Sequence, residues 1–315
     1  MKLQELKLSV DELHLAVNGE TSSPLKKELN ELIASGGKKF RPGLIFLFGQ
    51  LLGLAPEKLT TYARAVELTH LASLIHDDVI DESPTRRNHP TLNSHRNNTT
   101  AILSGDFLLS DVMGDLAKLN NNELLIDLTL AIKDLADGEW LQFDLKRKTQ
   151  VKISDLEEIA IKKTGSLIRW CCTTPGKLAG FADIKTLAFL GERIGLIFQM
   201  ADDIVDGMHT SGKPAFLDIV NGQINFVTCK LLDLYPELSD AVYSMRGKTL
   251  EKAPWTTEQY QKAMHAVDEI IKFERDKILS IFKELTDMNG EPELYSIFEM
   301  MILKIQSNYA GALNT

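Results

Sequence analysis

The chain has 315 residues, 44% of them hydrophobic and 25% charged, which is ordinary for a globular protein with a substantial core. Its net charge of −9 argues against a nucleic-acid partner or broad attraction to an anionic membrane. The longest apolar stretch, residues 43–55, is shorter than the roughly 20 residues that span a bilayer. With three cysteines in no disulfide or metal pattern, these features predict a cytoplasmic protein without a transmembrane segment.

Apolar residues recur at three- and four-residue spacing, for example from Leu124 to Leu135 and from Ile270 to Leu285. No β-branched run bounded by turn residues predicts a strand. Turn-forming residues divide the chain into about ten helices, with breaks at residues 18–24, 36–37, 54–56, 83–90, 120–122, 183, 208–214, 235–236, 247–254 and 289–292. No low-complexity linker separates two halves. We therefore predict an all-α fold, a large helical bundle that forms one domain over residues 1–315.

A basic turn is predicted early in the chain, at Gly36-Gly37-Lys38-Lys39-Phe40-Arg41-Pro42. The two glycines would let a phosphate group approach the backbone, and the three cations would bind it. Basic turns are common on protein surfaces, where most are simply solvated. This stretch is therefore weak evidence when it is taken alone.

The next acidic segment places Asp77, Asp78 and Asp81 at positions i, i+1 and i+4 of a predicted helix. These positions lie at about 0°, 100° and 40° around the helix axis, so the carboxylates share one arc. The rest of the segment is largely apolar, and like charges on a buried helix repel unless a cation or a water-filled cleft accommodates them. His70 lies on the same side, although an isolated histidine is more often a core residue. His76 points away from this arc and is assigned no chemistry.

The same spacing recurs at Asp202, Asp203 and Asp206. One triplet could be a solvated acidic face, but two with identical spacing in apolar sequence predict a metal site. Carboxylate oxygens suit hard cations, and Mg²⁺ commonly takes one or two carboxylates together with phosphate oxygens. Two such helices facing each other would hold a metal-bridged diphosphate. Gln199 shares the second acidic face and could orient substrate or metal-bound water.

Cations that could bind a diphosphate follow the first acidic segment. Arg86 and Arg87 lie at a predicted turn, and guanidinium groups donate two parallel hydrogen bonds to phosphate oxygens. Lys163 with Thr164, and Lys213 beside Gly212, are weaker candidates. Lys163 could equally lie on an exposed helix face.

Taken together, these motifs resemble the trans-isoprenyl diphosphate synthase family, also called polyprenyl synthetases, over residues 30 to 225. The residues that carry the resemblance are Gly36–Pro42, His70–Asp81, Arg86, Arg87, Gly105–Leu108, Gly138, Glu139, Gln142, Lys163, Thr164, Gly195, Phe198, Gln199, Asp202–Asp206, Gly212–Pro214 and Asp218. The resemblance implies the isoprenoid synthase fold, with about ten core helices around a central cavity. It also implies a homodimer that condenses isopentenyl diphosphate with an allylic prenyl diphosphate after Mg²⁺-assisted ionisation.

The resemblance further implies a role for each candidate residue, and three Mg²⁺ ions per active site. Asp77, Asp81 and Asp202 would ligate the metal, with Asp78, Asp203 and Asp206 in or near its shell. Arg86, Lys163 and Lys213 would hold the allylic diphosphate, and Lys38, Arg41, His70 and Arg87 that of isopentenyl diphosphate. Lys163, Thr164 and Gln199 would line the reacting centre as catalytic residues.

Two small residues one turn before the first aspartate, Ala72 and Ser73, are the expected determinants of product length. In the resembled family an aromatic pair at these positions would block the cavity after a short chain. We therefore expect an all-trans product longer than farnesyl diphosphate, geranylgeranyl or longer.

The sequence departs from the family pattern after the second acidic segment. Gln223, Asn225 and Val227 stand where the family commonly has Lys, Thr and Pro, Asn88 replaces a Gly, and a C-terminal Arg is missing. A lost cation at position 223 would weaken diphosphate binding.

Three alternatives stay open. A terpene cyclase or head-to-head synthase shares the fold but generally lacks the paired isopentenyl diphosphate site. A non-catalytic regulatory subunit of a heteromeric synthase would usually lose one aspartate motif, and this chain keeps both. A catalytic subunit that needs a small partner is also compatible with the sequence.

Overall fold

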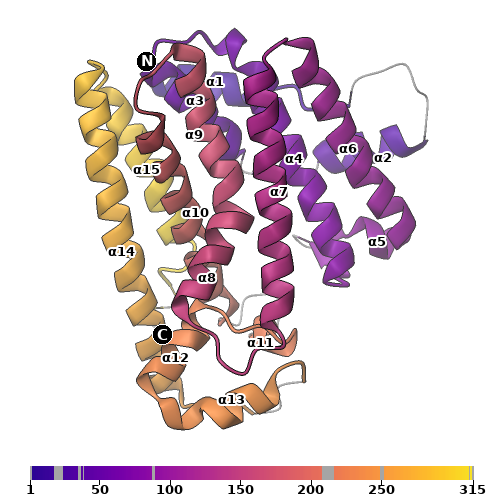
Figure 1. Ribbon diagram of the computed structural model, residues 1–315, viewed down its shortest axis with the longest axis vertical. Helices are drawn as coiled ribbons and strands as arrows, with labels where there is room; N and C mark the ends of the chain where they lie inside the picture. Colours follow the sequence, from indigo (N-terminus) through magenta and orange to yellow (C-terminus); the bar gives the residue numbers. More distant parts are fainter. Residues whose placement is uncertain are drawn as a thin grey trace. The chain divides into compact units, whose positions relative to one another are not determined.

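The computed structural model describes residues 2–17, 24–34, 37, 39–86, 89–207, 216–248, 252–311 and 313. Over these residues the chain is helical almost throughout (Figure 1), so the all-α prediction is confirmed. Two-residue strands, β1 (Thr85–Arg86) and β2 (His89–Pro90), pair antiparallel with Arg86 opposite His89. They fall inside the predicted break at residues 83–90. Segments this short have no hydrophobic periodicity, which is why the sequence pattern predicted no strand.

The chain forms two compact units, and the expectation of a single domain stays a prediction. The first unit comprises Met1–Ile132 and Trp170–Leu187, and the second comprises Lys133–Arg169 and Ala188–Thr315. The helices that begin in the first unit are α1 (Lys2–Asp11), α2 (Pro24–Ala34), α3 (Phe40–Leu51), η1 (Pro56–Lys58), α4 (Thr60–Ile80), α5 (Leu92–His95), α6 (Asn98–Lys118), α7 (Asn122–Leu145) and α10 (Ile184–Asp206). The helices that begin in the second unit are α8 (Ile153–Ala160), the π-helical turn η2 (Ile161–Gly165), α9 (Ser166–Ala179), α11 (Leu217–Val220), α12 (Phe226–Leu234), η3 (Pro236–Leu238), α13 (Ser239–Met245), α14 (Thr257–Met288) and α15 (Glu293–Ser307).

Helix α3 is a core helix of the first unit. It is apolar around most of its circumference, and the run Leu44–Phe48 is almost completely buried. A helix that is apolar on all sides is normally a core helix. This helix contains most of the longest apolar stretch of the sequence. Within the described residues, no helix has the length and hydropathy required to cross a membrane.

Helices α4 and α6 of the first unit are joined by a buried arginine. Arg64 is 7% exposed and its guanidinium pairs with Asp115 at 2.6 Å and Asp111 at 2.7 Å. The same side chain donates a 3.0 Å hydrogen bond to the Ala16 carbonyl. Removing one partner of a buried ion pair costs about 3–5 kcal/mol, because the other charge then lacks compensation. This contact therefore fixes α4, which ends in the first aspartate motif, against α6.

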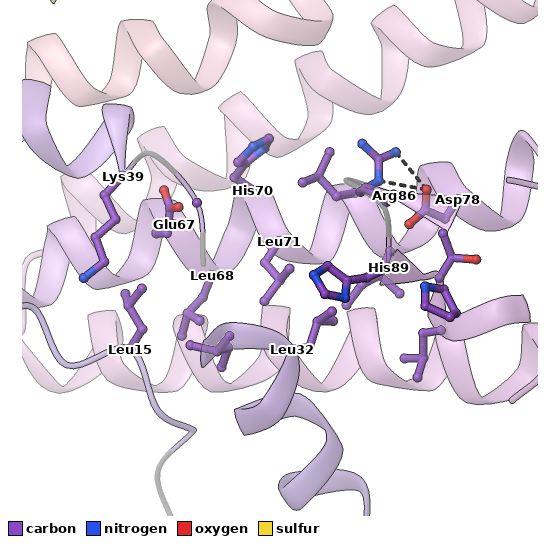
Figure 2. A pocket seen from close by; sticks show the side chains of 17 residues that line it. Leu15, Leu32, Lys39, Glu67, Leu68, His70, Leu71, Asp78, Arg86 and His89 are labelled. Atoms are coloured by element: carbon purple, nitrogen blue, oxygen red, sulfur yellow. Dashed lines mark hydrogen bonds and ion pairs between the residues drawn. The ribbon is translucent and has the colours of Figure 1, made fainter. Parts of the chain in front are cut away.

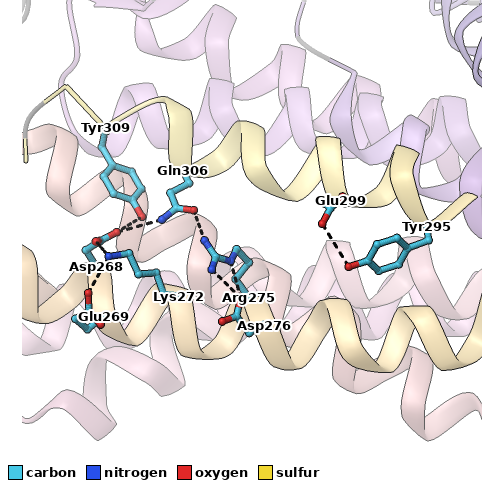
Figure 3. A network of polar contacts seen from close by, with 9 residues as sticks. All are labelled: Asp268, Glu269, Lys272, Arg275, Asp276, Tyr295, Glu299, Gln306 and Tyr309. Carbon is cyan, nitrogen blue, oxygen red and sulfur yellow. Dashed lines mark hydrogen bonds and ion pairs between the residues drawn. The ribbon is translucent and has the colours of Figure 1, made fainter.

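In the second unit, α14 and α15 run side by side, and a buried carboxylate of α14 binds residues at the end of α15 and just after it (Figures 1 and 3). Asp268 is 2% exposed, and its Oδ1 accepts a 2.9 Å hydrogen bond from the Tyr309 hydroxyl. Lys272 pairs with the other oxygen at 2.8 Å, and Gln306 donates to Oδ1 at 3.4 Å. Burial raises the pKa of Tyr309, and the bond to Asp268 acts in the same direction. The hydroxyl therefore stays protonated and, as a donor to Asp268, holds Tyr309 on α14.

Candidate active site

The first aspartate motif lies at the C-terminal end of α4, where Asp81 ends the helix. Asp77 and Asp81 are half-buried, whereas Asp78 is only 5% exposed. Asp78 is paired with Arg86, which donates from Nε at 2.9 Å and from Nη2 at 2.8 Å to the same carboxylate oxygen (Figure 2). Two nitrogen contacts on one oxygen form a strong charge-assisted interaction. The structure thus brings together a predicted metal-shell residue and a predicted diphosphate-binding residue.

The turn after α4 is folded back onto that helix. The Asp78 carbonyl accepts hydrogen bonds from the Ser83 backbone at 2.9 Å and from the Asn93 side chain at 3.0 Å. The Thr91 hydroxyl donates to the Ser83 carbonyl at 2.6 Å. These bonds satisfy carbonyl groups that the end of a helix leaves open. They explain how Arg86, eight residues after Asp78, returns to the carboxylate.

A cavity of about 120 Å³ lies along α4 in the first unit (Figure 2). Lys39 lies toward one end and the Asp78–Arg86 pair toward the other, with His70 and Glu67 on α4 between them. Leucine side chains from α2, α4 and the segment before α2 line the rest of the wall: Leu15, Leu32, Leu68, Leu71 and Leu74. Polar groups of both signs around an apolar wall suit a ligand with a charged head and an apolar tail.

The basic turn before α3 is only partly described. Gly37 lines the cavity, and Lys39 has a left-handed backbone with φ 45° while its Nζ donates a 3.1 Å hydrogen bond to the Val10 carbonyl. Arg41 is half-buried in the first turn of α3. Three predicted substrate-binding residues, Lys38, Arg87 and Lys213, lie outside the described residues. Their roles stay predictions.

His76 has a structural role that the sequence pattern did not indicate. Its Nε2 lies 3.2 Å from the Ile102 carbonyl of α6. A Cβ atom on Gly105 would come within 2.2 Å of that same ring nitrogen. Gly105 therefore provides the space that His76 needs between α4 and α6. Packing against the His76 ring thus explains the glycine at position 105, which is part of the family motif.

The second aspartate motif ends α10 in the second unit. Asp203 is 5% exposed, and its two oxygens accept hydrogen bonds from the Gln199 side chain at 3.0 Å and the Phe226 backbone at 2.9 Å. Burial raises the pKa of Asp203 well above its usual range, and the nearby charge of Asp218 adds to this effect. Asp202 is exposed and Asp206 half-buried. Thr164 donates to the Gln199 oxygen at 3.1 Å, so the structure joins two predicted catalytic residues to the acidic motif.

Lys163 and Thr164 lie in η2, a π-helical turn that neighbouring helices approach closely. A Cβ on Gly138 of α7 would lie 2.6 Å from the Lys163 backbone nitrogen, and one on Gly195 of α10 would lie 2.3 Å from the Gly165 Cα. Both contacts are with backbone atoms, which, unlike a flexible side chain, cannot adopt another rotamer to relieve the clash. π-helical turns occur frequently at functional sites. A side chain at position 138 or 195 would clash with this turn, which explains the two glycines.

Lys163 is held by side chains from α7. Its ammonium forms an ion pair with Glu139 and donates a 3.0 Å hydrogen bond to the Gln142 oxygen. The Gln142 amide in turn donates a 2.6 Å hydrogen bond to Gln223. Glu139 and Gln142 belong to the motif that carried the family resemblance, but the sequence did not indicate that they contact Lys163.

The residues that depart from the family pattern are integrated into the second unit. Asn225 accepts a 2.9 Å hydrogen bond from the Thr228 backbone, which caps α12. Its amide donates a 2.9 Å hydrogen bond to Asp218. The Asp218 backbone lies 3.4 Å from both carboxylate oxygens of Asp206. Val227 is fully buried in the first turn of the same helix.

The side chains present suit a hard divalent cation. Asp206, Asp218 and Asp203 provide only oxygen donors, and burial of Asp203 beside Asp218 is unfavourable for an ionised carboxylate unless a cation compensates. Within the part of the chain that the structure describes, no group of three or more His, Cys, Asp or Glu side chains is arranged to hold a metal ion. Mg²⁺ commonly uses only one or two carboxylates and fills its other positions with water and phosphate oxygens.

Comparisons with known proteins identify the family of the chain. The polyprenyl synthetase family profile matches residues 22–264. A prenyl transferase from Synechocystis sp. is 34% identical over 274 residues, which cover 84% of this chain and 82% of that protein. Component 2 of the heptaprenyl diphosphate synthase from Geobacillus stearothermophilus is 32% identical over 219 residues, covering 68% of each chain.

The fold comparison points the same way. The crystal structure of heptaprenyl diphosphate synthase from Staphylococcus aureus matches with a TM-score of 0.79 and 26% identity, covering 98% of both chains. The match of the family profile over most of the chain, together with these relatives, decides the assignment. The chain belongs to the polyprenyl synthetase family of prenyltransferases.

Proposed function

We propose that this chain condenses isopentenyl diphosphate with an allylic prenyl diphosphate and makes an all-trans product longer than farnesyl diphosphate. One observation carries the proposal. Each aspartate triplet ends a largely buried helix, α4 or α10, and each contacts a predicted substrate-binding or catalytic residue of its own unit. Arg86 pairs with Asp78 in the first unit, and Thr164 reaches Asp203 through Gln199 in the second.

The proposed chemistry begins with loss of diphosphate from the allylic substrate. Mg²⁺ bound by the aspartates, in our proposal three ions with Asp77, Asp81 and Asp202 as direct ligands, would stabilise negative charge on that leaving group. The Arg86 and Lys163 side chains would bind its oxygens, and Thr164 and Gln199 would line the reacting carbon. The carbon–oxygen bond breaks with its electron pair leaving on diphosphate, and the isopentenyl double bond attacks the resulting allylic cation. A proton then leaves the adduct, with the released diphosphate as acceptor.

Each unit contributes groups that suit this reaction. In the first unit, the cavity places His70 and Arg86 beside a leucine-rich wall, which suits a diphosphate with an isoprenoid tail. An apolar wall also keeps water from the allylic cation, which water would quench. In the second unit, Glu139 and Gln142 hold the Lys163 ammonium in place.

The test uses the full chain with Mg²⁺, labelled isopentenyl diphosphate and, separately, dimethylallyl, geranyl or farnesyl diphosphate. We expect extension, with products longer than fifteen carbons after dephosphorylation and sizing. Asp77→Ala and Asp202→Ala should each abolish extension while the protein stays folded by circular dichroism. A folded wild type that extends none of the primers would contradict a self-sufficient enzyme.

Two assembly states are compatible with the family, and we favour the homodimer. The first unit exposes Ile102, Leu103, Ile126 and Leu130 by 45%, 57%, 55% and 51%. Aliphatic side chains exposed to this degree suit burial in a protein interface. The mass from light scattering should therefore be about twice that of the chain.

The second candidate is the catalytic subunit of a heteromeric synthase. It is supported by the relative whose name identifies it as component 2 of a heptaprenyl diphosphate synthase. In that case, extension would appear only after a small partner protein is added.

A cytoplasmic location is also part of the proposal. Cys171, Cys172 and Cys229 are all free and buried, which suits a reducing compartment.

A further inference from the structure

The hydroxyl of Tyr260 is a buried polar group that the proposed reaction does not use. Tyr260 lies in the first turn of α14 and is 4% exposed. Among the residues that the structure describes, its hydroxyl oxygen has no hydrogen-bond partner. Most buried polar atoms in proteins are paired, because an unpaired one loses its bonds to water. A buried hydroxyl without a partner therefore requires an explanation.

The Tyr260 ring is held in a fixed position by aromatic neighbours. Its ring centroid lies 5.0 Å from that of Phe216, edge to face, and 5.6 Å from that of Trp255, stacked. Phe216 also donates a 2.8 Å backbone hydrogen bond to the Asp206 carbonyl. The aromatic cluster is thus attached to the end of the second aspartate motif.

The hydroxyl lies beside that motif. A Cβ on Gly207, the residue after Asp206, would come within 2.6 Å of the Tyr260 hydroxyl oxygen. Burial raises the pKa of Tyr260 well above its usual range, and the charges of Asp206 and Asp218 add to the shift. The group therefore stays protonated and can donate a hydrogen bond.

The neighbouring carboxylates already have other donors. Asp203 accepts from Gln199 and the Phe226 backbone, and Asp206 lies 3.4 Å from the Asp218 backbone nitrogen. The Tyr260 hydroxyl nevertheless donates to none of the described carboxylates, so an acceptor that a bound ligand brings would give it a partner. A cation bound by these aspartates would bring oxygen atoms, as coordinated water or as diphosphate.

We propose that Tyr260 is a binding residue of the second aspartate motif, whose hydroxyl donates a hydrogen bond to an oxygen coordinated by the bound cation. The inference rests on the proposed function, since it requires that Asp202, Asp203 and Asp206 bind a divalent cation. It adds a residue from α14, outside every motif that carried the family resemblance. It also explains why the chain has tyrosine at this position, where phenylalanine would avoid the free-energy cost of an unpaired buried hydroxyl.

The decisive variant is Tyr260→Phe, which removes only the hydroxyl. Thermal unfolding is measured with EDTA, with Mg²⁺ alone, and with Mg²⁺ plus inorganic diphosphate, and affinities are measured by calorimetry. With EDTA, Tyr260→Phe should be at least as stable as wild type, because no hydrogen bond is lost. Its affinity for the cation or for the cation with diphosphate should fall about tenfold or more, as expected for a hydrogen bond to a charged acceptor. If the affinity of Tyr260→Phe for Mg²⁺ alone is already reduced, the acceptor is coordinated water. If its affinity is reduced only when diphosphate is present, the acceptor is a diphosphate oxygen.

Tyr309→Phe is the matched control, because the Tyr309 hydroxyl has a partner in Asp268 (Figure 3). It should lose stability with EDTA and keep wild-type affinity for both ligands. The inference is overturned if Tyr260→Phe loses stability with EDTA as Tyr309→Phe does, or if its ligand affinities equal those of wild type. If wild type itself binds neither Mg²⁺ nor Mg²⁺ with diphosphate, the proposed function fails and the inference fails with it.

Discussion

The side-chain oxygen of Gln223 accepts a 2.6 Å hydrogen bond from the amide of Gln142. An amide has one oxygen and one NH₂ group, so this bond decides which of them faces Lys163. With its NH₂ group on Gln223, Gln142 presents its oxygen to the Lys163 ammonium at 3.0 Å. Gln223 therefore positions Lys163 through Gln142, although Lys163 and Gln223 are 60 positions apart in the sequence.

This relationship predicts the effect of restoring the cation that the family commonly has at position 223. Lysine has no acceptor, so in Gln223→Lys the Gln142 amide would turn its oxygen toward the new ammonium and away from Lys163. We expect the KM for the allylic diphosphate to rise about fivefold, which corresponds to about 1 kcal/mol for a lost hydrogen bond. Steady-state kinetics with a fixed saturating concentration of isopentenyl diphosphate measures it.

Gln223→Glu is the control, because glutamate keeps an acceptor for the Gln142 amide and should stay close to wild type. A lower KM in Gln223→Lys would contradict the positioning role. It would instead support the expectation that the lost cation weakens diphosphate binding in this chain.

A second prediction concerns the pair of Asp78 and Arg86. The Asp78 side chain is 8% exposed and that of Arg86 is 39% exposed, so the arginine is partly solvated and the carboxylate is not. Arg86→Leu should therefore destabilise the protein by about 1–3 kcal/mol, less than for a fully buried pair. Arg86→Lys should lose less stability, since the lysine ammonium still compensates the charge of the Asp78 carboxylate. Urea unfolding without added Mg²⁺ measures the difference, and equal stability of Arg86→Leu and wild type would show that Asp78 does not need this cation.

A third prediction tests the close approach of α10 to the π-helical turn. In Gly195→Ala the new Cβ would meet the Gly165 backbone at 2.3 Å, so the turn with Lys163 and Thr164 must move. We expect a loss of about 2–3 kcal/mol in stability and a large loss of kcat. Gly114→Ala in α6 is the control, because nothing lies within 4 Å of its Cβ. That substitution should raise stability by about 0.5–1 kcal/mol, as alanine suits a helix better than glycine.

The parts that the sequence predicted well are those that depend on local periodicity. Three- and four-residue spacing predicted the helices, and the two aspartate motifs do lie at the C-terminal ends of α4 and α10. The parts that it missed join distant residues. Gln142 and Gln223 are 81 positions apart, and Arg64 and Asp111 are 47 apart, so no window along the chain contains both partners.

The π-helical turn was also missed, for a related reason. Ile161, Lys162, Lys163 and Thr164 fit an α-helix as well as a π-helical turn, so the sequence pattern did not separate the two. The close contacts of Gly138 and Gly195 with this turn come from two other helices. The family resemblance marked both glycines, but only the packing explains them.

The last prediction separates two residues that the sequence treated as a pair. Ser73 is four positions before Asp77, so it lies about 40° from it around α4, whereas Ala72 lies about 140° away. Ala72 is fully buried, and the Ser73 hydroxyl, which donates a 2.8 Å bond to the His70 carbonyl, is only half-buried. Ser73→Phe should therefore place its ring on the carboxylate side of the helix, where the growing chain is expected, and shorten the product.

Ala72→Phe should instead force a ring into closely packed core and cost about 1–3 kcal/mol or more, with little effect on the chain length made by the folded fraction. Product sizing and urea unfolding of both variants, beside wild type, measure the two effects separately. A shortened product from Ala72→Phe together with an unchanged one from Ser73→Phe would reverse the assignment. In that case the growing chain would pass along the opposite side of α4, away from the first aspartate motif.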